Sequence, residues 1–527
     1  MTASRQEGFA GRGASELARL IRGGDVSARD VVEAHIRRIE DVDARLNAVV
    51  ARRFEEALAE ATRADDARAR GEVLGPLHGV PVTIKDQFLV AGMPTTFGLP
   101  PRASHRADGD GPLVARLRQA GAIVLGKTNV SQLLFYHESD NPVYGRTNNP
   151  WNLDRTPGGS SGGEGAIVAA GGSALGLGSD LGGSIRIPAH FCGIAGLKPS
   201  SRRLSLLDTP AGIFFEQDVI GYQPGPLART VADLALAMSV LAAPGQEAFD
   251  PTIEPRPWLD PKAIDIASLR VGMYEDDSWF RPSPAVRRAV REAGHALEGL
   301  GARVEPFRPP DVGEALRLFI AVLSADGLRT FHEALRGQPI DPRLKAFLAI
   351  SRIPRTVRPL VAATMTVVGR PHAALAVRAA GPWPADHFRV LDSEVRGYRE
   401  RFLASLDAAG VDALVCPPHA LAALTHGTGD DLTAITVGSY ATVFNVLGFP
   451  AGVVPVTRVR AGEESDRSRR RDVPTRKALA VEHGSVGLPI GVQVVARSWR
   501  EHVVLGVMAA LEAACRSWTD FPVEPPL

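Results

Sequence analysis

A glycine-rich stretch from Thr156 to Ser200 constrains this chain more than any other part of its sequence. It reads TPGGSSGGEGAIVAAGGSALGLGSDLGGSIRIPAHFCGIAGLKPS. Glycine allows a backbone to turn tightly or to pass close to another group. Ser160 and Ser184 lie within these glycine runs, and Lys85 lies upstream in the segment GVPVTIKD. Two serines and a lysine can make a serine nucleophile without histidine, which indicates acyl transfer.

The composition is typical of a soluble globular protein and excludes several classes of function. The chain has 527 residues, and length alone predicts about three or four domains, although large α/β enzymes often exceed this size per domain. Apolar residues make up 45% and charged residues 23%. The net charge of +1 gives no indication of a nucleic-acid partner. Three scattered cysteines predict neither a disulfide framework nor a zinc site.

No targeting or membrane-spanning segment is predicted. The N-terminal sequence MTASRQEGFAGRG lacks an apolar core of the signal-peptide type. The chain also lacks a run of ~18 apolar residues that would indicate a transmembrane helix. We therefore expect a cytoplasmic protein.

The pattern of apolar residues predicts both helices and strands. The first 70 residues are expected to be helical, with Ser27 and Asp30 forming a capping box. An amphipathic helix is predicted over 284–300. Buried strands are predicted at 78–86, 121–129, 269–274, 449–456 and 486–496.

Two other segments have an unusual charge pattern. Residues 341–375 are apolar and basic. This pattern is typical either of an interfacial membrane segment or of a buried helix pair whose arginines lie on the solvent-exposed face. The charged sequence between the last two predicted strands, about 458–480, is expected to be an exposed loop.

Two short motifs suggest other chemistries. Residues Gly121–Thr128 (GAIVLGKT) fit the P-loop pattern, but the Ala-Ile-Val-Leu interior favours a buried strand that ends near Lys127. Residues 158–162 (GGSSG) fit a nucleophile elbow, which would pair Ser160 with a downstream base such as His190 or His419. Nothing in the sequence marks either histidine as a base, so this is the weaker interpretation.

A longer set of motifs resembles the amidase signature family. NPVYGRTNNPWNLDRTPGGSSGGEGA, which begins at Asn141, is followed by GSDLGGSIRIPAHFCGIAGLKPS. GVPVTIKD upstream, and FPAGVVPV and VGLPIGVQVVA downstream, occur in the family's order. The resemblance spans roughly Ala14 to Glu512 and is weakest from about 250 to 400. Within the family, the segment GGSSGGEGA with Glu164 resembles the fatty acid amide hydrolase branch. The glutamyl-tRNA amidotransferase A subunit typically has a small residue at the position of Glu164.

The resemblance implies an α/β fold formed by one large α/β/α domain over residues 1–527, with a mixed, twisted central sheet. The core signature would cover about 76–230. A variable cap that forms the substrate pocket would cover about 250–400, and the exposed charged loop would follow at about 458–480.

The resemblance also implies a role for each site residue. Ser184 would be the nucleophile and Lys85 the base, acting through Ser160, which the family holds after a cis peptide bond, here Gly159–Ser160. Burial lowers the pKa of a lysine, so a buried Lys85 could accept a proton. The backbone N–H groups of Leu181, Gly182, Gly183 and Ser184 would form the oxyanion hole. Ser161 would have a supporting role, and Asp180 and Arg186 are expected to brace the turn as a buried pair rather than to contact the substrate.

We therefore expect an amide hydrolase of the Ser-Ser-Lys type, to which ester and carbamate hydrolysis would also be accessible. No metal or organic cofactor is expected. The expected partners are a small-molecule amide, at most a peripheral membrane contact through 341–375, and a second copy in a homodimer, with no nucleic acid. The alternatives are the A subunit of a tRNA-dependent amidotransferase and a nucleotide-binding protein that uses Gly121–Thr128.

Overall fold

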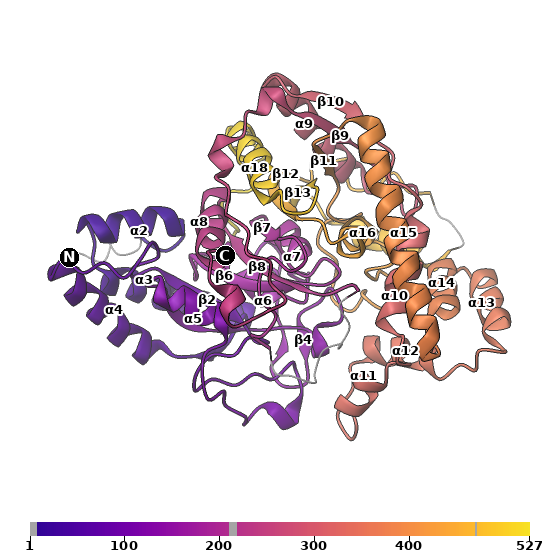
Figure 1. The fold of residues 1–527 in the computed structure, drawn as a ribbon, viewed down its shortest axis with the longest axis horizontal. Helices are drawn as coiled ribbons and strands as arrows, with labels where there is room; N and C mark the ends of the chain where they lie inside the picture. The colour runs from indigo at the N-terminus through magenta and orange to yellow at the C-terminus, as the bar shows by residue number, and fades with distance from the viewer. Residues whose placement is uncertain (1–7, 210–218, 469–471) are drawn as a thin grey trace.

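The computed structural model describes residues 8–209, 219–468 and 472–527, and a large mixed β-sheet organises them (Figure 1). Within these residues, eleven strands pair in the order β1-β3-β2-β6-β8-β7-β12-β13-β11-β9-β10. The strands are β1 Val49–Arg52, β2 Pro81–Lys85, β3 Ile123–Thr128, β6 Leu175–Asp180, β7 Ala195–Lys198, β8 Gln223–Ala228, β9 Arg270–Met273, β10 Arg303–Pro306, β11 Ala413–Cys416, β12 Ala451–Arg458 and β13 Pro489–Ala496. A separate small ribbon pairs β4 Asp140–Asn141 with β5 Gly145–Arg146.

The predicted strands and the mixed character of the sheet are confirmed. β2 pairs in parallel with both β3 and β6, whereas β12 and β13 pair antiparallel in the centre. Every residue of β2, β3, β6 and β13 is buried, as expected for strands covered on both faces. Within the segment 121–128, residues Ile123–Thr128 form β3 rather than a P-loop, and no helix follows Lys127 directly. The Lys127 ammonium is buried and donates to Pro94 O at 2.5 Å and to Thr95 Oγ1 at 2.8 Å.

Helices cover the sheet and extend beyond both of its ends. They are α2 Ala14–Gly23, α3 Ala28–Leu46, α4 Phe54–Ala69, α5 Pro112–Gln119, α6 Gly162–Ala169, α7 Arg186–Cys192, α8 Val231–Leu241, α9 Pro284–Gly299, α10 Val312–Leu323, α11 Arg329–Ala334, α12 Pro342–Ser351, α13 Arg358–Val367, α14 Pro371–Ala379, α15 Ala385–Ala409, α16 Ser439–Leu447, α17 Val473–Glu482 and α18 Glu501–Cys515. The helix predicted over 284–300 is confirmed as α9. The predicted cap is also confirmed, because Ser27 Oγ accepts from the Asp30 amide at 2.9 Å. The expectation of a wholly helical N-terminal region is wrong at β1, which pairs with the buried strand β3.

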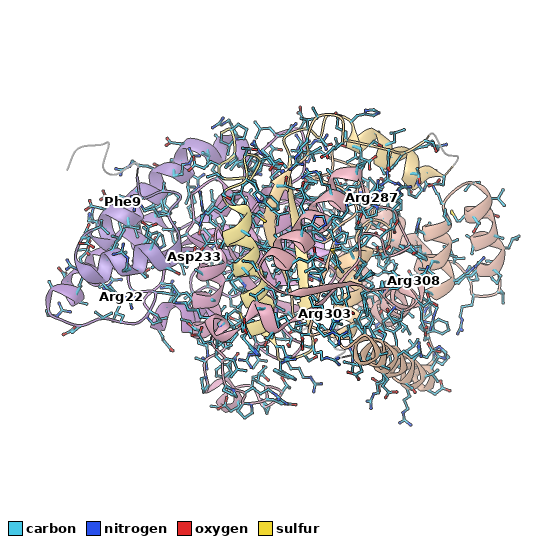
Figure 2. The ribbon with its side chains drawn as sticks, turned by 90° about the horizontal axis from the view of Figure 1, so that it is seen from above. Phe9, Arg22, Asp233, Arg287, Arg303 and Arg308 are labelled. Atoms are coloured by element: carbon cyan, nitrogen blue, oxygen red, sulfur yellow. The ribbon has the colours of Figure 1, made fainter. Side chains whose placement is uncertain are left out.

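The two ends of the molecule are built from different parts of the chain. Helices α2–α4 lie at one end, and α11–α14 lie at the opposite end, with the sheet between them (Figure 1). In the view from above, Phe9 and Arg22 lie at the first end, and Arg303 and Arg308 lie well away from them (Figure 2). Helices α6 and α7 pack against each other beside the sheet, and α7 also contacts β12 and β13. The glycine-rich stretch therefore joins the two halves of the sheet.

The structure corrects two expectations about charged segments. Residues 341–375 form three short helices, α12, α13 and α14, rather than a helix pair. Arg343 does not lie on a solvent-exposed face, because its guanidinium forms ion pairs with the carboxylates of Glu138, Asp140 and Asp341. The expected loop at 458–480 is wrong in its second half, which forms α17 from Val473. In its first half the side chain of Arg467 is buried against Glu482.

In the part of the chain that the structure describes, no helix has both the length and the apolar character needed to cross a bilayer.

Candidate active site

Lys85 is the last residue of β2, and its side chain is completely buried. Its Nζ atom lies 2.8 Å from Ser160 Oγ, 3.0 Å from Ser179 Oγ and 3.4 Å from Ser179 O. Burial lowers the pKa of Lys85 to about 7, although Asp180 and Glu164 partly oppose this shift. A substantial fraction of Lys85 is therefore a neutral amine at neutral pH.

Both serines singled out by the sequence lie at turns that lead into helices. Ser160 follows the cis peptide Gly159–Ser160 just before α6, and Ser184 lies between β6 and α7. The two turns are joined directly, because the Ser161 amide donates to Ser184 O at 3.2 Å. Ser161 Oγ also bonds both the carbonyl and the amide of Ser179, at 3.2 and 3.3 Å. Ser161 therefore joins the turn of Ser160 to the end of β6.

The carboxylate of Asp180 organises the turn that carries Ser184. It forms a two-bond ion pair with Arg186 at 2.9 Å, and both side chains are fully buried. It also accepts from the amides of Gly183 at 2.8 Å and Ile185 at 3.1 Å. Burial alone would raise the pKa of Asp180, but the Arg186 guanidinium outweighs it and holds that pKa well below its usual range. The buried pair expected from the sequence is thus present.

The amides of this turn have different partners. The Gly183 amide is occupied by Asp180, and Gly182 O, in the same peptide, lies 3.1 Å from Nε2 of His137. Burial lowers the pKa of His137 to about 4, so its neutral ring donates to that carbonyl. Gly183 has a φ of +109°, which disfavours a side chain at this position. Among the described residues, no acceptor is present for the amides of Leu181, Gly182 and Ser184.

Glu164 connects α6 to the strands beneath it. Its carboxyl group is fully buried and accepts from Thr83 Oγ1 at 2.5 Å on β2 and from Thr128 Oγ1 at 2.8 Å on β3. Burial raises the pKa of Glu164 to about 8. The side chain therefore packs α6 onto the strand that carries Lys85.

The two histidines considered as bases for a nucleophile elbow, His190 and His419, form hydrogen bonds with backbone groups. His190 is hydrogen-bonded on both ring nitrogens, to Leu421 O and to the Gly491 amide. His419 interacts through Nδ1 with the backbone of Leu421. Neither ring has a hydrogen bond to Ser160 among the described residues, and the elbow interpretation is wrong.

A cavity of about 310 Å³ opens onto Ser184. Leu181, Gly182 and His137 form its floor beside the serine. Its walls come mainly from helices α10–α14 and are largely apolar: Leu133, Phe135, Phe319, Leu323, Phe331, Phe347, Ile350, Ile353, Met365 and Val377. Ser184 is 8% exposed, whereas Ser160 and Lys85 lie behind it at 1% and 0%. Only the first of the three side chains can meet a bound molecule directly.

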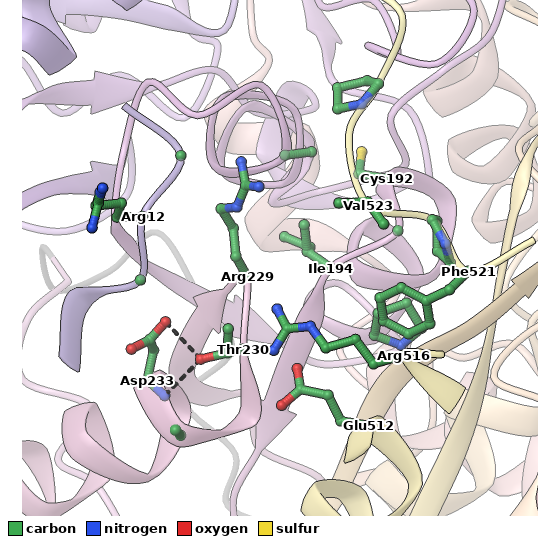
Figure 3. A pocket seen from close by; sticks show the side chains of 18 of the residues that line it. Arg12, Cys192, Ile194, Arg229, Thr230, Asp233, Glu512, Arg516, Phe521 and Val523 are labelled. Carbon is green, nitrogen blue, oxygen red and sulfur yellow. Dashed lines mark hydrogen bonds between the residues drawn. The ribbon is translucent and has the colours of Figure 1, made fainter. Parts of the chain in front are cut away.

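A second cavity, of about 400 Å³, lies between the N-terminal and C-terminal segments (Figure 3). Arg12, Arg229, Glu512 and Phe521 line it. None of the residues predicted to be catalytic lies there. The two cavities thus lie in separate places, and the lining at Ser184 includes the charged side chains Arg343, Arg370, Asp430 and Asp431 as well as its apolar walls.

Sequence reasoning missed several buried residues of the site. Ser179 accepts a hydrogen bond from Lys85, and Gln87 accepts one from Ser179. His137 forms a hydrogen bond with the Gly182 carbonyl. The available signal was positional, because Gln87 closely follows β2 and Ser179 lies near the end of the parallel neighbour β6. Polar residues at the carboxyl ends of adjacent parallel strands are expected to meet.

Comparisons with known proteins agree with this geometry. The family model described as Amidase matches residues 30–505. Fatty-acid amide hydrolase 1 of Sus scrofa is 34% identical over 502 residues, which cover 94% of this chain and 84% of that protein. A solved structure of fatty acid amide hydrolase superposes with a TM-score of 0.85 at 26% identity, covering 99% of this chain and 87% of that one. The A subunit of glutamyl-tRNA(Gln) amidotransferase from Moorella thermoacetica is 39% identical over 316 residues, 59% of this chain and 63% of that protein.

Proposed function

This chain belongs to the amidase signature family and is an amide-hydrolysing enzyme, and we propose that it forms an acyl-enzyme on Ser184. The observation that carries this proposal is the 2.8 Å contact between a buried, easily deprotonated Lys85 and Ser160, directly behind the serine that opens onto the cavity. Amide hydrolysis needs an activated nucleophile, stabilisation of an oxyanion, and a proton for the leaving amine. Lys85 and Ser160 can first activate the nucleophile and then supply the proton to the leaving amine.

In the proposed reaction, Ser184 Oγ attacks the amide carbon as its proton passes to Ser160 Oγ and the Ser160 proton passes to Lys85. The Lys85 ammonium then returns a proton through Ser160 to the leaving nitrogen, and the amine departs. Water repeats the same steps on the acyl-enzyme and releases the acid. The Asp180–Arg186 pair keeps the turn in place during both halves of the reaction.

The oxyanion would be held by backbone amides of the Ser184 turn. The amides of Leu181, Gly182 and Ser184 support this role, since each is a donor without an acceptor among the described residues. The family resemblance includes Gly183 as well, but its amide donates to Asp180. We therefore assign Gly183 the role of holding the turn, and the other three amides the role of oxyanion donors.

The lining of the cavity supports an apolar acyl group as the substrate's acid part. Most of the lining side chains are Phe, Leu, Ile, Met, Val and Ala, which favour an apolar group, although Arg343, Arg370, Asp430 and Asp431 also line the cavity. Esters and carbamates pass through a similar oxyanion and would be accepted on the same residues. The amidotransferase subunit is the second candidate, but its match covers a smaller share of this chain than that of fatty-acid amide hydrolase 1.

Substitutions at the three central side chains test the mechanism. Ser184→Ala and Lys85→Met should each lower kcat by about 10³-fold or more, because each removes a step that the others cannot replace. Ser160→Ala should lower kcat by about 10²-fold, since a water can partly relay the proton. Steady-state hydrolysis of an acyl anilide measures all three. Ser205→Ala, at a buried serine that bonds Asp250, is the control, and full activity in Ser184→Ala would refute the assignment.

The pH dependence of turnover tests the role of Lys85. Because only the neutral amine accepts a proton and its pKa is lowered to about 7, kcat/KM should rise with pH through this region and then level off. Burial raises the pKa of Glu164 to about 8, so its carboxyl group is mostly neutral where Lys85 titrates, and Glu164→Gln should leave the acid limb nearly unchanged. A wild-type profile that falls as pH rises through 7 would contradict the assignment.

A series of acyl anilides from acetyl to dodecanoyl tests the substrate class. We expect kcat/KM to rise with chain length, because each buried methylene contributes about 0.8 kcal/mol. Ala373→Phe, on the cavity wall in α14, should reduce the dodecanoyl rate by about tenfold or more relative to acetyl. Ala363→Phe, at an exposed position of α13, is the matched control. A preference for short or aryl acyl groups would assign the enzyme to another class of amide.

Helix α13 supports at most a peripheral membrane contact. Leu360 and Val367 are 71% and 86% exposed on it, beside the exposed Arg355. Leu360→Glu with Val367→Glu should reduce sedimentation with phosphatidylcholine–phosphatidylserine vesicles by about tenfold, because each apolar side chain contributes about 1.5–3 kcal/mol when buried. Val73→Glu with Leu74→Glu, at exposed positions after α4, is the control. Equal loss in both double variants would exclude this surface.

A further inference from the structure

Two buried residues form a second layer behind the proposed triad. Gln87 is completely buried and Ser179 is 4% exposed. Ser179 Oγ donates its proton to Gln87 Oε1. The Gln87 amide nitrogen lies 3.4 Å from Thr209 Oγ1. Among the described residues, the glutamine has no hydrogen bond to Ser184 and does not line the cavity, and its hydrogen bond to Ser179 connects it to the site.

The number of protons around Lys85 limits how this amine can be oriented. A neutral amine has two N–H donors and one lone pair, and three oxygen atoms surround it: Ser160 Oγ, Ser179 Oγ and Ser179 O. The carbonyl can only accept, so it takes one N–H. Ser179 Oγ, whose own proton is held by Gln87, must also accept and takes the other. The lone pair that remains points to Ser160.

We propose that Gln87 is a positioning residue that directs the lone pair of Lys85 to the Ser160 hydroxyl by holding the proton of Ser179. The proposal rests on the proposed function of the same site. Without this acceptor, the Ser179 hydroxyl can rotate and donate to the amine. It would then occupy the lone pair that should receive the Ser160 proton.

The protons balance through both forms of the lysine. As the Ser184 O–H bond breaks and the new C–O bond forms, Ser160 gains the Ser184 proton and gives its own to Lys85. The resulting ammonium has three N–H donors, and the same three oxygen atoms accept them. Ser179 therefore remains an acceptor throughout, and only the proton shared with Ser160 moves.

The charged groups around Lys85 do not compete for this lone pair. Three carboxyl groups raise the pKa of Lys85, and each of them has other hydrogen-bond partners: Asp180, Glu164 and Asp86. Asp180 is paired with Arg186, and Glu164 accepts from two threonines. Asp86 accepts from the backbone and side chain of Thr96 and from the Phe97 amide. Besides Ser160, Ser179 is the one hydrogen-bonded neighbour among the described residues whose proton could be turned toward the amine.

A double-mutant cycle tests the proposal. Gln87→Met keeps the length of the side chain but removes the acceptor, and should lower kcat about tenfold with KM within twofold of the wild type. In a Ser179→Ala background no competing hydroxyl remains, so adding Gln87→Met should change kcat by less than twofold. Gln246→Met, at another buried glutamine that bonds Ser205 and Arg203, controls for the loss of a buried amide and should keep the wild-type kcat.

Several outcomes would overturn the proposal. An unchanged or higher kcat in folded Gln87→Met would do so, as would equal effects of this change with and without the Ser179 hydroxyl. A different result would refute the proposed function itself: a wild-type enzyme with no amide hydrolysis that depends on Ser184. An active wild type with an unaffected Gln87→Met refutes only the role of Gln87.

If Gln87→Met does not fold, Gln87→Glu tests the same contact. Its carboxylate keeps an acceptor for Ser179, so kcat at high pH should stay within about threefold of the wild type. Its negative charge favours the Lys85 ammonium, so the acid limb of the pH profile should move to higher pH. A tenfold lower kcat at the plateau would overturn the proposal.

Discussion

The buried ion pair between Asp180 and Arg186 is the interaction on which the rest of the site depends. Asp180 ends β6 and holds the turn of Ser184, while Arg186 also reaches Asn445 on α16 and Gln493 on β13. Removing one partner of such a pair commonly costs about 3–5 kcal/mol, because the other charge stays buried and unpaired. The same bonds that stabilise the fold therefore fix the orientation of the amides around Ser184.

Burial has the opposite consequence for Lys85. Asp180 keeps its charge because Arg186 offsets the loss of water, whereas the hydrogen-bond partners of Lys85 among the described residues are neutral oxygen atoms. Desolvation then favours the neutral amine and brings its pKa to about 7. Two ionisable groups at the ends of adjacent parallel strands thus differ in charge because their neighbours differ.

Much of the fold and of the central site could be predicted from the sequence. Alternating apolar residues identified β2, and a continuous apolar run identified β3. The motif order placed Lys85, Ser160 and the Asp180–Arg186 pair. The strand β1 was missed because its partner, β3, is distant in the chain. Gln87 was missed for the same kind of reason, since its contact with Ser179 exists only after β2 and β6 pair.

The structure separates the chemistry from the shape of the cavity. Lys85 and Asp180 end two strands of the sheet, and Ser160 and Ser184 lie at the turns before α6 and α7. The apolar walls come largely from helices α10–α14, which lie beyond the other end of the sheet from α2–α4. A changed side chain on these helices alters the space for an acyl group without touching a hydrogen bond of the site. Substrate preference can therefore vary while the proton path stays the same.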